Sequence, residues 1–354
     1  MGWQIFESYR AFTKPKPTVL KKLLALLALA ALLSACEPDT LTPTGNGDTS
    51  KPNPEQPEGG DNPSGGDGGG QEGIPGKPEG DAPAISTWHW SSDTDRYGIN
   101  FVVTDSVKAA ATLDSYRQHN VRRVYGGYAH IPAHPTQRHS LKSWNRQLYA
   151  SGIRSVYLIG SSRWIYPEYR EDMRSYIGKY YVSFNQAALP AERLQGLHVD
   201  IEPHQLDEWA LATPARKREL LLMLRDTYAD IRAFLTANGM GDDEVMADIP
   251  VWFDSLTAIG WESEADRDAW FASVTSLVDG FSLMAYEVSS LPTLLSRTEW
   301  ERNQLDAVVE VGLNASEVGT VWQSKSAFLS ALHGIQQSTQ AWVVIHSYAV
   351  FMQL

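Results

Sequence analysis

From residue 84 to the end of the chain, short runs rich in Val, Ile, Tyr and Leu alternate with longer segments of helical periodicity. The short apolar runs predict buried strands, and the longer segments predict amphipathic helices. Eight strands are expected, at Ile85–Trp90, Val121–Tyr128, Ile153–Gly160, Gly196–Glu202, Glu244–Pro250, Val278–Tyr286, Ala307–Gly312 and Ala341–His346. Seven helices are expected between them, at Ser106–His119, Leu141–Ser151, Glu168–Tyr180, Pro214–Asn238, Glu264–Leu277, Thr293–Asn303 and Ser324–Ser338.

The regular alternation of strands and helices predicts an α/β fold, a (β/α)8 TIM barrel that covers residues 84–354. A doubly wound open sheet is the alternative, because periodicity does not distinguish a closed sheet from an open one. Only eight residues follow His346, so we expect the last helix to be missing or replaced. In a barrel, chemistry is expected at the carboxyl ends of the strands.

Residues 1–35 have the pattern of an export signal. Two lysines precede an apolar run, Leu23–Leu33, which is shorter than the ~20 residues that a membrane-spanning helix needs. The run leads into Leu-Ser-Ala followed by Cys36, which resembles the bacterial lipobox. That resemblance implies a lipidated Cys36 and a protein anchored to a bacterial membrane, in the periplasm or at the cell surface. A cleaved secretory signal with an incidental cysteine is the alternative.

Residues 36–83 have the composition of a linker. The segment after the cysteine holds twelve Gly, nine Pro and ten Asp or Glu, and it contains no aromatic residue. Such a segment buries too little apolar surface to offset its chain entropy, so we expect a disordered acidic tether. The tether would hold a folded domain away from a lipid surface, which suits an enzyme and a binding module equally well.

Charge and cysteine content narrow the classes of function. The formal net charge of −12 argues against nucleic acid as a partner. The single cysteine excludes an intramolecular disulfide framework and a cysteine-rich metal site. The histidines show no compact metal-binding spacing, and the chain has neither a Gly-x-Ser-x-Gly elbow nor a nucleotide-binding glycine motif. We therefore expect no metal and no cofactor, and we expect a monomer that the lipid would attach to a membrane.

The fourth expected strand carries the clearest candidate chemistry. With period-two alternation, His198, Asp200 and Glu202 point to one side of this strand. The other side is apolar and can face the surrounding helices, with Leu197, Val199 and Ile201. Two acids confined in one site do not both ionise easily, so one proton is retained or shared near neutral pH. A retained proton is what a general acid requires. A structural polar layer inside the barrel is the alternative.

The segment Gln195–Glu202 resembles the fourth-strand signature of glycoside hydrolase family 18, Asp-x-x-Asp-x-Asp-x-Glu. Met284–Glu287 resembles that family's sixth-strand motif, Met-x-Tyr-Asp. The resemblance implies that Glu202 protonates the glycosidic oxygen, that Asp200 orients a substrate acetamido group, and that Tyr286 helps to hold this group. In that family the N-acetyl group of the substrate is the nucleophile. The chain departs from the pattern at Gln195, His198, Glu287 and Trp342.

A second scheme involves the seventh strand. Alternation along that strand allows Glu310 to reach the barrel mouth opposite Glu202. Acids at the ends of strands four and seven resemble the large clan A of retaining glycosidases, and Ile201-Glu202-Pro203 is similar to its Asn-Glu-Pro. This resemblance implies that Glu202 is the acid and base and that Glu310 is the nucleophile. A structural carboxylate in an ion pair is the other interpretation of Glu310.

The remaining candidates would bind substrate. Trp offers a large rigid surface with a polar edge, which suits a sugar, and buried packing is the competing explanation for each Trp. The side chains that we expect to line a substrate site are Asp248, Trp252, His346, Trp90 and His198, with Trp88 and Trp164 as further aromatic candidates.

The sequence thus favours a membrane-anchored glycoside hydrolase that acts on an extracytoplasmic glycan, with N-acetylated amino sugars as a candidate substrate. A carbohydrate-binding lipoprotein without catalytic activity and a surface protein that binds a partner are the alternatives. The identity of the substrate depends on the shapes of the loops at the barrel mouth, and the sequence alone does not give these shapes.

Overall fold

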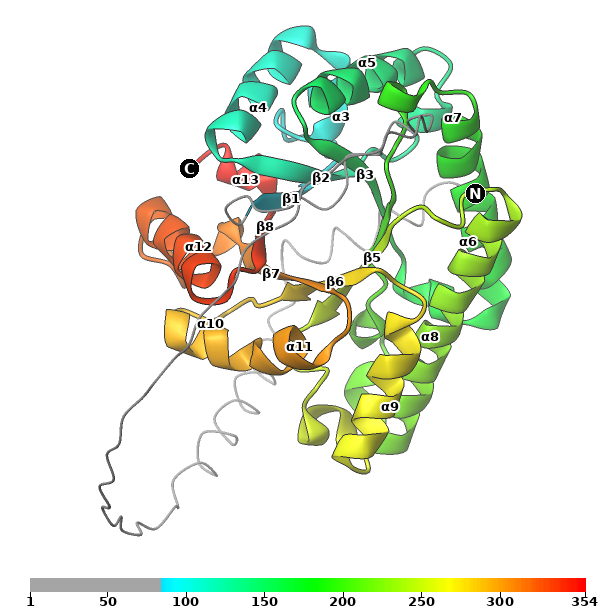
Figure 1. The fold of residues 1–354 in the computed structure, drawn as a ribbon, viewed down its shortest axis with the longest axis vertical. Coiled ribbons are helices and arrows are strands. Elements are labelled where there is room, and N and C mark those ends of the chain that lie inside the picture. Colours follow the sequence, from blue (N-terminus) through cyan, green and yellow to red (C-terminus); the bar gives the residue numbers. More distant parts are fainter. Residues whose placement is uncertain (1–83) are drawn as a thin grey trace, which may run out of the picture. The chain divides into compact units, whose positions relative to one another are not determined.

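The eight expected strands form a closed barrel in which each strand pairs in parallel with the next, and β8 returns to β1 (Figure 1). The computed structural model describes residues 84–354; the predicted signal peptide, Cys36 and the tether lie outside the described residues. The strands are β1 (Ile85–Trp90), β2 (Val121–Gly127), β3 (Arg154–Ile159), β4 (Leu197–Val199), β5 (Val245–Pro250), β6 (Gly280–Met284), β7 (Val308–Asn314) and β8 (Trp342–His346).

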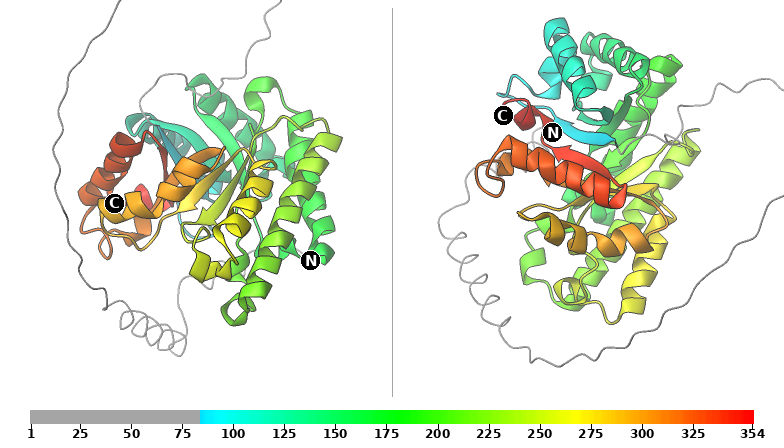
Figure 2. Two further views of the ribbon diagram at one scale, coloured as in Figure 1. Left: turned by 60° about the horizontal axis from the view of Figure 1, so that its bottom comes forward. Right: turned by 60° about the vertical axis from the view of Figure 1, so that its left-hand side comes forward.

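Helices surround the barrel in both views of Figure 2. They are α3 (Ile99–Thr104), α4 (Ser106–Gln118), α5 (Gln137–Ala150), α6 (Arg170–Ile177), α7 (Ser183–Gln186), α8 (Pro214–Ala237), α9 (Glu264–Thr275), α10 (Leu291–Arg297), α11 (Glu299–Gln304), α12 (Lys325–Thr339) and α13 (Tyr348–Phe351). Among the helices of residues 84–354, none combines the length and the hydrophobicity needed to cross a bilayer.

The predicted TIM barrel is confirmed, and the open sheet is excluded. The usual last helix is replaced by the four-residue α13, as expected. Several details differ from the prediction. β4 ends at Val199 rather than at Glu202, and β6 ends at Met284 rather than at Tyr286. The single helix expected over Thr293–Asn303 is divided into α10 and α11, and α3 and α7 were not predicted. The sequence of α3, Ile-Asn-Phe-Val-Val-Thr, has strand-like residues, and packing of its buried face overrides that local preference.

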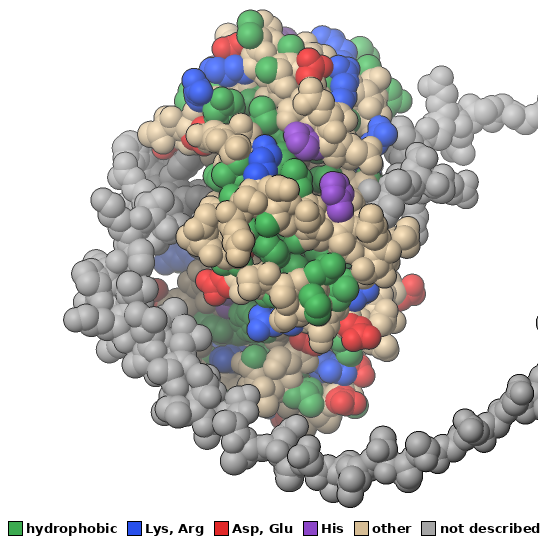
Figure 3. All heavy atoms as spheres, turned by 90° about the vertical axis from the view of Figure 1, so that its left-hand side faces the viewer, with side chains coloured by type: hydrophobic (Ala, Val, Ile, Leu, Met, Phe, Trp, Pro, Cys, Tyr) green, Lys and Arg blue, Asp and Glu red, His purple; other side chains and the backbone are tan. Residues whose placement is uncertain are grey.

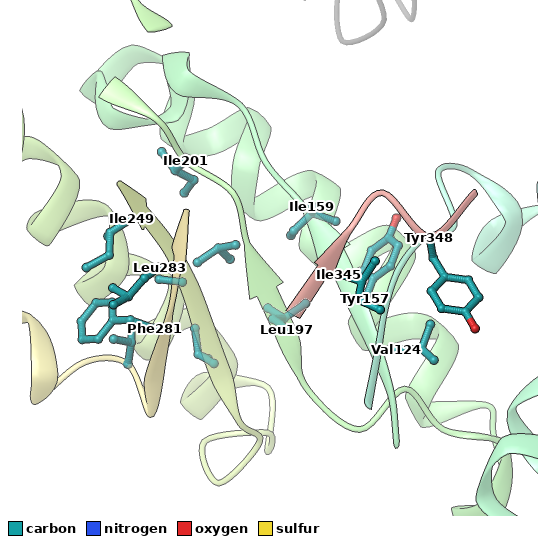
Figure 4. Close-up of a cluster of buried hydrophobic side chains, with 14 of the residues drawn as sticks. Val124, Tyr157, Ile159, Leu197, Ile201, Ile249, Phe281, Leu283, Ile345 and Tyr348 are labelled. Atoms are coloured by element: carbon teal, nitrogen blue, oxygen red, sulfur yellow. The ribbon is translucent and has the colours of Figure 1, made fainter. Parts of the chain in front are cut away.

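Alternate side chains of each strand pack on opposite sides of the barrel wall. The outward-facing apolar residues join one large core beneath the helices, and Figure 4 shows part of it, including Leu197, Ile201 and Ile249. The predicted apolar face of the fourth strand is therefore confirmed. A smaller apolar cluster fills the barrel interior and consists of Trp88, Tyr125, Val156, Leu158, Met246 and Val344.

The face drawn in Figure 3 carries acidic and basic side chains interspersed with hydrophobic and neutral ones. This distribution is typical of a solvated surface, and the view does not single out a patch of one charge. The distinctive chemistry of the described chain lies inside the barrel and at its mouth.

Outside the barrel interior, Glu301 of α11 is fully buried, and neither of its carboxylate oxygens has a hydrogen-bond partner. Burial raises the pKa of Glu301 from 4.5 to about 8, and the nearby Asp254 carboxylate adds to this shift. Because the folded pKa exceeds the unfolded one, the native state binds the extra proton between these two values. This proton stabilises the fold fully below about pH 4, and the contribution is lost as the pH rises to about 8.

We therefore expect Glu301→Gln to flatten the fall in unfolding free energy between pH 5 and pH 8, since glutamine stays neutral. Urea unfolding of the wild type and the variant at each pH measures this effect. Glu299→Gln is the control, because Glu299 belongs to the same helix and is exposed. Parallel pH profiles for wild type and Glu301→Gln would contradict the expectation.

Candidate active site

One polar layer of the barrel interior lies toward the amino-terminal ends of the strands and is called the lower layer. It is built around Glu310, the third residue of β7, whose exposed fraction is 0%. Its Oε1 accepts hydrogen bonds from Ser86 at 2.8 Å and from Arg123 at 2.7 Å. Its Oε2 accepts from Tyr125 at 2.7 Å and from Ser282 at 3.1 Å. Four donors thus occupy both oxygens of the Glu310 carboxylate.

The expectation that Glu310 reaches the mouth opposite Glu202 is wrong. Glu310 pairs in register with Trp342, the first residue of β8, so it lies toward the amino-terminal end of the barrel. Its partner Arg123 also contacts Glu244, which directly precedes β5, at 3.1 Å. Glu310 is therefore a structural carboxylate in a buried ion pair, and the two-carboxylate scheme has no nucleophile at this position.

Above this layer, His198, Asp248 and Trp88 meet in the centre of the barrel. His198 Nε2 lies 2.7 Å from Asp248 Oδ1, and the Trp88 indole N–H donates to Asp248 Oδ2 at 3.2 Å. All three side chains are buried. Trp88 is consequently part of the barrel core and a hydrogen-bond donor, which agrees with the packing explanation rather than with a sugar platform.

Burial sets the protonation of this layer. It lowers the pKa of His198 to about 3, so the imidazole is neutral near pH 7. It raises the pKa of Asp248 well above its ordinary value, and the charge of Glu202 adds to that shift. A protonated Asp248 carboxyl can donate to the neutral His198, which gives the inner layer no net charge. The residue that departs from the family pattern, His198, thus has a hydrogen-bond partner contributed by β5.

Asp200 and Glu202 follow β4 toward the mouth of the barrel. The backbone N–H of Asp200 donates to Ile159 O at 2.8 Å, which extends the contact with β3 by one residue beyond β4. Gly160 allows this approach: a Cβ at that position would lie 1.8 Å from the Asp200 carbonyl oxygen. The close backbone contact fixes the place at which the acid pair begins.

The two carboxyl groups of the pair influence each other electrostatically and differ in proton affinity. Burial raises the pKa of Asp200 well above its ordinary value, and the Glu202 carboxylate raises it further. Burial also raises the pKa of Glu202, but hydrogen bonds led by that of His204 bring it below the ordinary value. One proton is thus shared between a neutral Asp200 and an ionised Glu202. Glu202 keeps access to solvent, with a side-chain exposed fraction of 20%.

Two candidates from other strands lie near this pair. His346 ends β8, its ring centroid is 5.5 Å from that of Tyr286, and its pKa is lowered to about 4 by burial while the charge of Glu202 opposes the shift. Tyr286 follows β6 and is partly buried. The next residue, Glu287, has a φ of 59°, and its N–H donates to Glu317 Oε1 at 2.8 Å. Glu317 thus anchors the backbone turn that follows Tyr286.

Trp252 and Trp90 both lie at the carboxyl-terminal end of the barrel. Trp252 follows β5, is partly buried, and packs with its ring centroid 5.4 Å from that of His204. Trp90 is the last residue of β1, and Gly127 leaves space for it, since a Cβ there would lie 2.8 Å from the Trp90 ring. Trp164 is buried among core residues outside the barrel. Substrate contact by Trp252 and Trp90 stays a prediction.

The structure therefore brings most of the expected residues together at the barrel mouth or just beneath it, and it places Glu310 away from them. His198, Asp200, Glu202, Asp248 and His346 are linked by hydrogen bonds or by mutual electrostatic effects. Sequence analysis did not single out His204, whose Nε2 lies 3.0 Å from Glu202 Oε2. It also missed the donors that surround Glu310. The period-two spacing of Arg123 and Tyr125 on β2 was the available signal for that layer.

Within residues 84–354, no three His, Cys, Asp or Glu side chains form a group that could hold a metal ion. The expectation of a metal-free reaction stays a prediction. The site that the fold defines is a partly buried acid pair at the carboxyl end of a TIM barrel.

No protein-family model matches the chain, and no curated protein matches it. Among solved structures, it is similar to a GH18 chitinase from Pseudoalteromonas aurantia, with 12% identity, 74% of this chain and 92% of that chain covered, and a TM-score of 0.49. The PgaB glycoside hydrolase domain from Bordetella bronchiseptica has 10% identity, coverage of 77% and 96%, and a TM-score of 0.46. The spore cortex-lytic enzyme SleL from Bacillus megaterium has 9% identity, coverage of 77% and 72%, and a TM-score of 0.45. At such identities, these similarities leave the activity of this chain open.

Proposed function

We propose that this protein is a glycoside hydrolase in which Glu202 is the general acid. The observation that supports this function is the Asp200–Glu202 pair, two electrostatically coupled carboxyl groups that follow β4 and whose pKa values are shifted in opposite directions. Protonation of a glycosidic oxygen needs an acid that keeps a proton near neutral pH, and the pair stores one there.

We further propose that the substrate contains N-acetylated amino sugars and that its own acetamido group attacks the anomeric carbon. The alternative nucleophile, Glu310, is fully buried and bonded to four donors. A substrate acetamido group needs a nearby polar side chain to orient it, and Asp200 and Tyr286 are the proposed partners. Asp200 passes the shared proton to Glu202, and Glu202 donates it to the leaving oxygen and recovers one from the water that completes hydrolysis.

The proposed location rests on residues outside the described part of the chain. The Leu-Ser-Ala-Cys36 sequence and the acidic Gly- and Pro-rich segment after it support a lipid-anchored protein that faces a glycan outside the cytoplasm. A flexible acidic tether would let the barrel reach a polymer at some distance from the membrane.

The test is hydrolysis of N-acetylglucosamine oligosaccharides by the purified protein, measured as new reducing ends. Fully de-N-acetylated oligosaccharides of the same length are the matched control, because they lack the proposed nucleophile. Cleavage of the acetylated series alone is the expected result. Saturable binding of the acetylated series without cleavage would replace the proposal with a carbohydrate-binding function, and cleavage of both series would contradict the acetamido mechanism.

A further inference from the structure

His204 is the basic residue in contact with the proposed general acid. It lies in the 3-10 helix η7 (Pro203–Gln205), and its Nε2 is 3.0 Å from Glu202 Oε2. Among the described residues, it forms the only ion-pair contact recorded for Glu202. The His204 side chain has an exposed fraction of 16%, and its Nδ1 is buried without a hydrogen-bond partner. The geometry therefore directs the polar interaction of this imidazole chiefly at Glu202.

Aromatic packing fixes the orientation of the imidazole. The ring meets Trp252 at a centroid distance of 5.4 Å and an interplanar angle of 78°, and it meets Phe253 at 6.1 Å and 86°. Edge-to-face contacts of this kind favour one ring orientation. Pro203 also restricts the backbone of Glu202, which has φ −108° and ψ 89°. Both partners of the contact are thus held before any substrate binds.

The charged groups on the elements next to His204 do not pair with Glu202. Glu208, beside the next 3-10 helix, pairs with Arg216 of α8 at 2.8 Å. Arg163, in the packed helix η3 (Ser162–Ile165), is exposed and lies over the Tyr169 ring. The loop that carries Trp252 continues to Asp254, whose pKa burial raises. The groups that face Glu202 itself from the barrel are Asp200, Asp248 and His346.

We propose that His204 is a positioning residue that holds Glu202 Oε2 and leaves Oε1 for the scissile bond. This inference rests on the proposed function of Glu202. The hydrogen bond from His204 lowers the pKa of Glu202 and holds its carboxyl group in one orientation. A carboxyl group held in this way presents its other oxygen to the leaving group, so the His204 contact supports the rate of hydrolysis more than the affinity for substrate.

Two substitutions separate the hydrogen bond of His204 from its aromatic packing. His204→Gln keeps an N–H donor and loses the ring, so kcat falls about threefold with little change in KM. His204→Phe keeps the aromatic packing and loses the donor, so kcat falls about tenfold with little change in KM. His139→Gln, at an exposed position of α5, is the control and leaves both kcat and KM unchanged.

A second measurement does not depend on activity. The side-chain carboxyl carbon of Glu202, followed by NMR after ¹³C labelling and assigned with Glu202→Gln, titrates about one unit higher in His204→Phe than in the wild type, since the anion has lost its donor. An unchanged Glu202 titration in His204→Phe, or a kcat of that variant that equals the wild-type value, overturns the role of His204 even if the enzyme is active. Absence of hydrolysis in the wild type refutes the proposed function, while the NMR titration still decides whether the pair is coupled.

Discussion

Replacing Glu202 with glutamine is expected to lower kcat for N-acetylated oligosaccharides by about 10³-fold. Glutamine has nearly the same shape and keeps an oxygen for the His204 contact, but it has no proton to give to the leaving oxygen. Substrate binding should change little, because the partly exposed side chain at the mouth keeps its volume. The measurement is kcat and KM from reducing-end release, with substrate affinity determined separately by calorimetry.

The control for this variant is Glu208→Gln, in the loop between β4 and α8. Glu208 accepts from Arg216 and lies outside the acid pair, so its substitution should leave kcat within about twofold. Activity of Glu202→Gln close to that of the wild type would show that another group protonates the leaving oxygen. The proposed function would then have to be abandoned for this site.

Glu310→Gln is expected to lower the free energy of unfolding by about 3–5 kcal/mol, the second large effect. The substitution removes the negative charge beside Arg123 and places an amide N–H₂ among side chains that donate hydrogen bonds. A buried guanidinium left with less compensation is costly, because the interior offers no water to solvate it. Urea unfolding measures the loss as a lower midpoint at an unchanged slope.

A milder variant tests the same layer in case Glu310→Gln does not fold. Ser282→Ala removes one of the four donors to Glu310 and should cost about 1 kcal/mol without altering hydrolysis. Folded Glu310→Gln protein should likewise retain the pH profile of the wild type, since Glu310 lies in the lower layer of the barrel. A stable Glu310→Gln protein without hydrolytic activity would restore Glu310 as a nucleophile candidate.

The sequence by itself determined the architecture of residues 84–354 and the position of the acids. Apolar runs placed all eight strands, because a strand buried on both faces needs nearly continuous hydrophobic residues. Alternation along the fourth strand separated Leu197, Val199 and Ile201 from His198 and the acids, and the structure places these apolar side chains in the outer core. These features depend on local spacing, which sequence records directly.

Only the tertiary structure decided which carboxylates form a site. Glu202 and Glu310 both alternate correctly along their strands, but the register between β7 and β8 sets Glu310 level with the start of β8. Register and barrel closure are properties of strand pairs, so the pattern of one strand does not contain them. The His198–Asp248 contact joins residues 50 positions apart, and the His204–Glu202 contact depends on how a loop packs against Trp252. Protonation follows from that packing, because burial and neighbouring charges set each pKa.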